Sequence, residues 1–229
     1  MPYPYIDYWY IILVVPAIVF SLIASANVNS TFKKFSKTAS RMGITGAESA
    51  RRVLEANGVT GVRIEPISGN LTDHFDPKSN TIRLSESVYG SNTVAAIGVA
   101  AHEAGHAVQY AVGYSPMKLR AAIIPVTNIG AKLSWPLILI GLLLSSYSLA
   151  MLGVIAFGFS TLFQLVTLFV EFDASNRAVN AIGGMCAGAD EVNGTKKVLR
   201  AAALTYVAAL AVSLANLLRL FLLVNRRRD

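Results

Sequence analysis

Charged residues, cysteine and histidine are all scarce in this chain of 229 residues. Charged residues make up 14% of the sequence, against about 25% in soluble domains. The single cysteine, Cys186, excludes an intrachain disulfide and a metal site built from several cysteines. Only three histidines are present, and no acidic residue occurs between His106 and Glu171. The composition is too apolar for a purely soluble protein.

The missing charges leave long apolar segments. Residues 8–28 and 137–170 carry no charge, and Arg219 is the one charged residue in 201–224. About 20 apolar residues are enough to span a bilayer. The pattern therefore predicts an integral membrane protein with the lipid bilayer as its partner. The first segment lacks the basic residues that open a signal peptide, so we expect an uncleaved anchor.

The middle segment is too long for one span. At 1.5 Å per residue its 34 residues would extend about 50 Å, against a hydrocarbon core of about 30 Å. Together with the apolar residues after Arg120 it predicts two spans joined by a turn near Ser145–Ser148. We expect an N-terminal anchor (1–28), a polar region (29–118), a two-span hairpin (119–170), a helix leaving the membrane (171–200), and a C-terminal transmembrane helix with a basic tail (201–229).

The formal net charge is +7, which by itself could indicate a nucleic-acid partner. The basic residues gather beside the apolar segments, however, where anionic headgroups attract them, so no nucleic-acid partner is expected. The positive-inside rule places the loops, and with them the histidines, on the cytoplasmic side. Both termini would then lie outside, which the tail NRRRD contradicts, and the orientation of the last segment stays open.

The polar region is predicted to hold a short sheet and two helices. VRIEPI and TIRLS alternate as strands do, and DPKSN is a turn between LTDHF and the second of them. Thr45 followed by Glu48 predicts the start of a helix over AESARRVLEAN. Ser91 or Asn92 can cap the next helix, which we expect to run to about Val112.

This second helix contains the stretch VAAHEAGHAVQY, in which His102 and His106 are four residues apart. Residues i and i+4 share a helix face, so both imidazoles can bind one metal ion. Glu103 lies about 100° around the helix, beside such an ion, where a general base for water must stand. HExxH is a known zinc-binding pattern with these roles. The sequence predicts one zinc ion per chain and Glu103 as the catalytic residue.

A catalytic zinc ion needs a third protein ligand. Gln109 and Val112 stand where a metzincin has glycine and histidine, which excludes that class. Two crossings return the chain to the face it left, and Glu171 is the first acidic residue after the hairpin. We therefore expect Glu171 as the third ligand, with His74 as the alternative.

At these residues the chain resembles the YugP-type membrane zinc metallopeptidases of bacteria. The resemblance covers nearly the whole chain and is carried by DHFDPKSNTIRLSESVY, AAHEAGHAVQ, SWPLILIGLLL, EFDASNRA and KKVLRAAALTYVAA. More distantly the chain is similar to HtpX and the CAAX prenyl endopeptidases, gluzincins whose third ligand is a glutamate on a helix after a membrane hairpin. The resemblance implies a mainly α, integral membrane fold of about four transmembrane helices with a small α/β gluzincin-like domain.

The resemblance also implies a zinc endopeptidase of the bacterial inner membrane, but no particular substrate. The position of the site near the cytoplasmic membrane surface favours a peptide or membrane-protein substrate. In HtpX and the CAAX prenyl endopeptidases an aspartate lies four residues after the glutamate ligand, whereas this chain has Ser175 there. Candidates for stabilising the transition state or supporting the ligands are His74, Asp173, Tyr110 and Arg177. Gluzincins bind an extended substrate at a sheet edge, and the candidate edge strand is TIRLS (Thr81, Ile82, Arg83, Leu84 and Ser85).

Two other functions compete with hydrolysis. A non-catalytic membrane scaffold with a structural metal site would have no use for a base at Glu103. A transporter would need ionisable groups inside its spans, and the hairpin has none between Lys132 and Glu171. Hydrolysis is therefore the favoured function, and the scaffold is its alternative.

Overall fold

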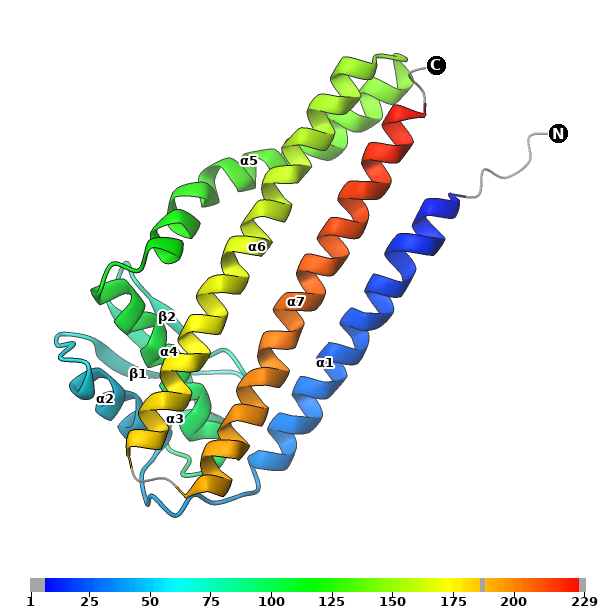
Figure 1. The fold of residues 1–229 in the computed structure, drawn as a ribbon. Coiled ribbons are helices and arrows are strands. Elements are labelled where there is room, and N and C mark those ends of the chain that lie inside the picture. The colour runs from blue at the N-terminus through cyan, green and yellow to red at the C-terminus, as the bar shows by residue number, and fades with distance from the viewer. Residues whose placement is uncertain (1–6, 186–187, 227–229) are drawn as a thin grey trace. The chain divides into compact units, whose positions relative to one another are not determined.

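The computed structural model describes residues 7–185 and 188–226, so Cys186 and the end of the basic tail lie outside the described residues. The chain forms two compact units (Figure 1). The first, here called the transmembrane unit, comprises Met1–Ala24, Leu119–Leu168 and Thr205–Asp229. The second, here called the site unit, comprises Ser25–Lys118 and Phe169–Leu204.

Among the described residues, four helices are long and apolar enough to cross a membrane. They are η1 (Tyr10–Val14) continued by α1 (Val15–Phe35), α5 (Ser115–Leu143), α6 (Tyr147–Gly184) and α7 (Ala189–Asn225). The mainly helical membrane fold predicted from the sequence is thereby confirmed. The turn between α5 and α6 contains Ser145, with a left-handed φ of 52°. This turn lies where the hairpin was expected to reverse.

The transmembrane unit contains an ion pair that explains the charge in the last apolar segment. Arg219 Nε and Nη2 each lie 2.7 Å from Asp7 Oδ2. The guanidinium also lies 5.0 Å from the centroid of the Tyr10 ring. A charged side chain among apolar helices is costly unless it is paired. Arg219 is therefore compatible with a membrane-spanning α7.

The site unit contains a three-stranded sheet of β1 (Arg63–Ile67), β2 (His74–Asp76) and β3 (Thr81–Ser85). The strand order is β1-β3-β2, with β3 parallel to β1 and antiparallel to β2. The expectation that Thr81–Ser85 offers a free edge is wrong, because β3 is hydrogen-bonded on both sides. The edge strands are β1 and β2.

The remaining helices of the site unit are α2 (Gly46–Ala56), α3 (Glu86–Tyr89) and α4 (Val94–Ala111). Thr45 caps α2 as predicted, because its hydroxyl accepts from Glu48 N at 3.2 Å. The cap of α4 is Thr93 and not Ser91 or Asn92. Its backbone is extended, and its hydroxyl accepts from Ala96 N at 3.3 Å. The chain leaves α4 through Gly113, whose φ is 67°.

The buried centre of the site unit is α4, which packs against α2 and the sheet. Ala100, Ala101 and Ala104 are fully buried there. A Cβ atom at Gly105 would lie 2.8 Å from the backbone oxygen of Ala174 in α6. Glycine at this position is therefore required for the backbones of α4 and α6 to approach as closely as they do. This approach brings the two helices of the candidate site together.

Candidate metal centre

Three donor side chains from two helices meet in the site unit. His102 and His106 come from α4 and Glu171 comes from α6. His102 Nε2 lies 3.2 Å from Glu171 Oε2, and His106 Nε2 lies 3.5 Å from the same oxygen. One donor atom of each residue lies within 4.8 Å of the other two. We call these three residues the donor cluster. It contains Glu171, the third ligand expected from two crossings.

The spacing of the donor cluster fits a zinc ion. Tetrahedral zinc has ligands at about 2.0–2.1 Å, which places ligand atoms about 3.4 Å from one another. The two nitrogen-to-oxygen distances, 3.2 and 3.5 Å, lie on either side of that value. Two imidazoles and one carboxylate are also a known donor set of catalytic zinc sites, with the fourth position open. The three side chains could therefore hold zinc with little rearrangement.

Both histidines are held through the ring nitrogen that is not in the cluster. His106 Nδ1 lies 3.0 Å from Gln109 Oε1, and His102 Nδ1 lies 3.2 Å from the hydroxyl of Ser175. An amide oxygen only accepts hydrogen bonds, so His106 carries its proton on Nδ1. Its Nε2 lone pair is then directed at the metal position. Such contacts fix the tautomer and orientation of histidine ligands.

Gln109 is fully buried and joins α4 and α6, the two helices that carry the donor cluster. Its Nε2 donates to the backbone oxygen of Val170 and to Asp173 Oδ2, both at 2.8 Å. Arg177 Nε donates to the same carboxylate oxygen at 2.6 Å. Asp173 and Arg177 therefore act on His106 through Gln109 and not by direct contact. Val170 immediately precedes Glu171. The Gln109 side chain therefore holds His106 and also the backbone next to Glu171.

Sequence reasoning missed Gln109 and Ser175 as supports of the ligands. Gln109 is three residues after His106, close to it on the same helix face. Ser175 is four residues after Glu171, one turn further along α6, and its hydroxyl lies 3.2 Å from His102 Nδ1. These two helical spacings were the sequence signals that could have indicated a contact with the histidines.

Acidic side chains surround His106. Burial by itself lowers the pKa of this imidazole, but the hydrogen bond with Glu171 and the negative charges of Glu103 and Glu171 outweigh it. The pKa of His106 is therefore raised above its usual value of 6.5. A proton competes with a metal ion for His106 Nε2, so acidification favours metal release.

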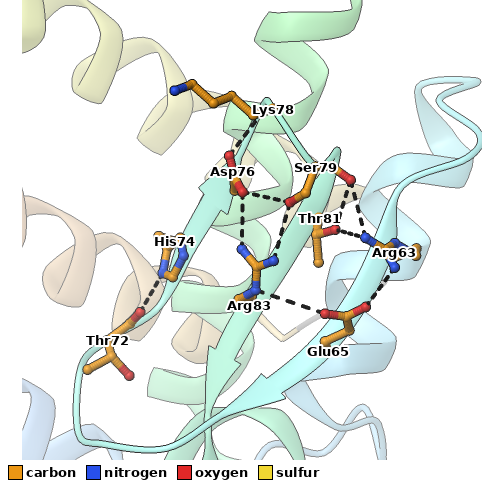
Figure 2. Close-up of polar contacts among 9 residues, drawn as sticks. All are labelled: Arg63, Glu65, Thr72, His74, Asp76, Lys78, Ser79, Thr81 and Arg83. Atoms are coloured by element: carbon orange, nitrogen blue, oxygen red, sulfur yellow. Dashed lines mark hydrogen bonds and ion pairs between the residues drawn. The ribbon is translucent and has the colours of Figure 1, made fainter.

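The structure does not bring His74 to the donor cluster. His74 and Asp76 alternate with Phe75 along β2, and it is the Phe75 ring that contacts Tyr110 of α4, at 5.9 Å between centroids. His74 lies on the opposite face of the sheet, where its Nδ1 is 2.8 Å from the backbone oxygen of Thr72 (Figure 2). Tyr110 is 52% exposed. The alternative third ligand is thus on the wrong face of β2.

The face of the sheet that carries His74 is a charged network (Figure 2). Arg83 on the central strand lies between Asp76, at 3.3 Å, and Glu65, at 3.9 Å. Hydrogen bonds from the Ser79 hydroxyl and from Lys78 N lower the pKa of Asp76 to about 2. The carboxylate therefore stays ionised, and the network stabilises the β2–β3 turn without taking part in the donor cluster.

Comparisons with known proteins agree with this geometry. A family described as "Putative neutral zinc metallopeptidase" matches residues 10–225. The chain belongs to this family. A relative of this chain, "Putative membrane protease YugP" from Bacillus subtilis (strain 168), is 46% identical over 222 residues, which cover 96% of this chain and 98% of the relative. No solved structure matches the chain. The resemblance to the YugP-type membrane metallopeptidases, inferred from the sequence, is confirmed.

Replacing Gln109 by leucine is expected to weaken zinc binding by about 10- to 100-fold, the usual effect of removing a residue that orients a ligand. Leucine has a similar size but can neither accept from His106 nor donate to the Val170 carbonyl. Competition with a chromophoric chelator in detergent measures the affinity. Gln164→Leu, the same substitution in the transmembrane unit, is the control and should leave the affinity unchanged. Equal affinities for Gln109→Leu and wild type would contradict the role of Gln109.

Proposed function

We propose that the chain is a membrane-embedded, zinc-dependent endopeptidase that hydrolyses peptide bonds of membrane-associated substrates. The observation that carries this proposal is the donor cluster, with two nitrogen-to-oxygen distances that suit tetrahedral zinc. Glu103 supplies a further carboxylate that the cluster does not need as a ligand. A non-catalytic scaffold with a structural metal would have no use for that carboxylate. The family match supports the same conclusion.

The residues of the site have different roles in the proposed hydrolysis. His102, His106 and Glu171 would hold the zinc ion. The bound ion would act as a Lewis acid, polarising a carbonyl and making water more acidic. The Glu103 carboxylate accepts the proton of the attacking water and delivers it to the leaving amine. Glu103 is 8% exposed, so little bulk water competes for that proton. Gln109 and Ser175 keep the imidazoles oriented throughout.

We assign substrate binding to the edge strand β2. This strand has β3 as its neighbour on one side in the sheet order, which leaves its other side available to an extended peptide. The ring contact between Phe75 and Tyr110 ties β2 to the ligand-bearing helix. An added strand at this edge would therefore run beside α4, which carries both histidines. The central strand β3 cannot accept a peptide in this way.

We place the site unit on the cytoplasmic side of the bacterial inner membrane. Lys33, Lys34 and Lys37 follow the first apolar segment, and no lysine or arginine precedes it. Positive charge of this kind marks cytoplasmic ends. A site so close to the ends of membrane helices suits membrane proteins and peptides bound to the membrane surface as substrates.

Removing zinc is expected to abolish proteolysis, and restoring it is expected to recover the activity. The protein, reconstituted in liposomes, would be incubated with solubilised bacterial membrane proteins, and new N-termini would be identified by mass spectrometry. Magnesium is the matched control, because it prefers six oxygen ligands and should not restore cleavage. New N-termini that persist after complete removal of zinc would overturn the proposal.

A further inference from the structure

The site unit contains a pocket that none of the donor-cluster residues lines. It has a volume of about 360 Å³ and is bounded by the end of α1 and by the loop between β1 and β2. Lys33 and Lys37 line the α1 side, together with Asn29. Asn29 and Lys33 are four residues apart on one face of α1, and Lys37 lies in the turn that directly follows the helix. We call this cavity the lysine pocket.

The lysine pocket is positively charged and rich in hydrogen-bond donors. No acidic residue lines it. Within the described residues, neither Lys33 nor Lys37 forms an ion pair with a carboxylate. Across from them, Asn70 accepts a hydrogen bond from the Ser87 hydroxyl through its Oδ1 at 3.1 Å. The amide N–H groups of Asn70 are left as donors, so the pocket suits an anionic oxygen ligand.

The lysine pocket begins where the apolar part of α1 ends. Residues 8–28 carry no charge, and Asn29 is the next residue. A helix that leaves the hydrocarbon core at this point places Lys33 and Lys37 at the level of the lipid headgroups. The rim of the pocket includes Leu71, which is 45% exposed and has a left-handed φ of 55°. That conformation is uncommon for a bulky side chain, and it leaves an apolar side chain on the rim of the pocket that the two lysines line.

We propose that the lysine pocket binds the headgroup of an anionic phospholipid from the surrounding membrane. The lipid phosphate lies between the ammonium groups of Lys33 and Lys37, and the Asn70 amide donates to one of its oxygens. Leu71 packs against the upper part of the acyl chains. A free phosphate ion would satisfy the lysines equally well, but it would give no role to the apolar rim or to the position of the pocket at the end of a membrane helix.

The test is lipid binding to the full chain in detergent, measured by native mass spectrometry with phosphatidylglycerol and with phosphatidylcholine. Wild type is expected to bind phosphatidylglycerol at least about tenfold more tightly, because the pocket selects net negative charge. The double variant Lys33→Gln/Lys37→Gln should lose about 30-fold in that affinity, from the usual contribution of two lysines at a charged surface. The binding of phosphatidylcholine should change little.

The matched control removes two charges from the same basic segment without touching the pocket. Lys34→Gln/Arg41→Gln fits this need, because neither residue lines the pocket, and it should keep the affinity of wild type. Equal losses in both double variants would show unspecific attraction and overturn the proposal, as would no loss in either. Displacement of phosphatidylglycerol by millimolar inorganic phosphate would overturn the lipid assignment in favour of a free anion. Leu71→Ser leaves both lysines in place and should weaken lipid binding several-fold.

Discussion

Replacing Glu171 by alanine is expected to remove most of the zinc from the purified protein. Wild type should contain about one zinc ion per chain, as three protein ligands in a catalytic site imply. The variant loses the carboxylate oxygen that lies 3.2 and 3.5 Å from the two imidazoles. Two neutral imidazoles are left, with no ligand charge to balance the ion. Zinc per chain in detergent, measured by elemental mass spectrometry, gives the result directly.

The control for this experiment is Glu86→Ala, which removes an exposed carboxylate from the same unit. Its zinc content should match that of wild type. Both variants should elute as folded protein on size exclusion, so that loss of zinc is not loss of fold. Unchanged zinc in Glu171→Ala would place the third ligand elsewhere. It would also remove the main support for two crossings between α4 and Glu171.

The membrane helices and the small elements of the polar region could be predicted from the sequence because they depend on local patterns. Apolar length indicated the spans, and Thr45 with Glu48 indicated the start of α2. The order of the strands could not be predicted in this way, since pairing is decided by contacts between distant segments. Thr81 and Ser85 are both fully buried in the structure, but their polar side chains and Arg83 between them gave no sequence signal that this strand is central.

The three residues of the donor cluster could be predicted because each depends on a count along the chain. His102 and His106 follow from helix periodicity, and Glu171 follows from the number of crossings. Gln109 could not be assigned a role by counting. Its contacts with Val170 and Asp173 depend on how α6 is rotated and on how closely it approaches at Gly105. Interhelical hydrogen bonds of this kind are properties of tertiary packing, which a single sequence does not specify.

Replacing Glu103 by glutamine is expected to leave zinc in place and to reduce proteolysis by about 10²- to 10⁴-fold, the usual contribution of a general base. Glutamine has nearly the same shape, so the packing of α4 and the donor cluster should persist. An amide cannot accept the proton of the attacking water at neutral pH. The measurement combines zinc per chain with the rate at which new N-termini appear in membrane proteins incubated with the reconstituted enzyme.

The two readouts of Glu103→Gln separate the roles that a carboxylate beside zinc can have. Retained zinc with lost cleavage assigns Glu103 as the base and excludes a purely structural metal site. Retained zinc with unchanged cleavage would contradict the assignment of Glu103 as the base, because the reaction would then proceed without the proposed proton acceptor. Lost zinc would make Glu103 a ligand, which its position about 100° from His102 around α4 argues against. Glu86→Gln, the same neutralisation at an exposed position, should change neither readout.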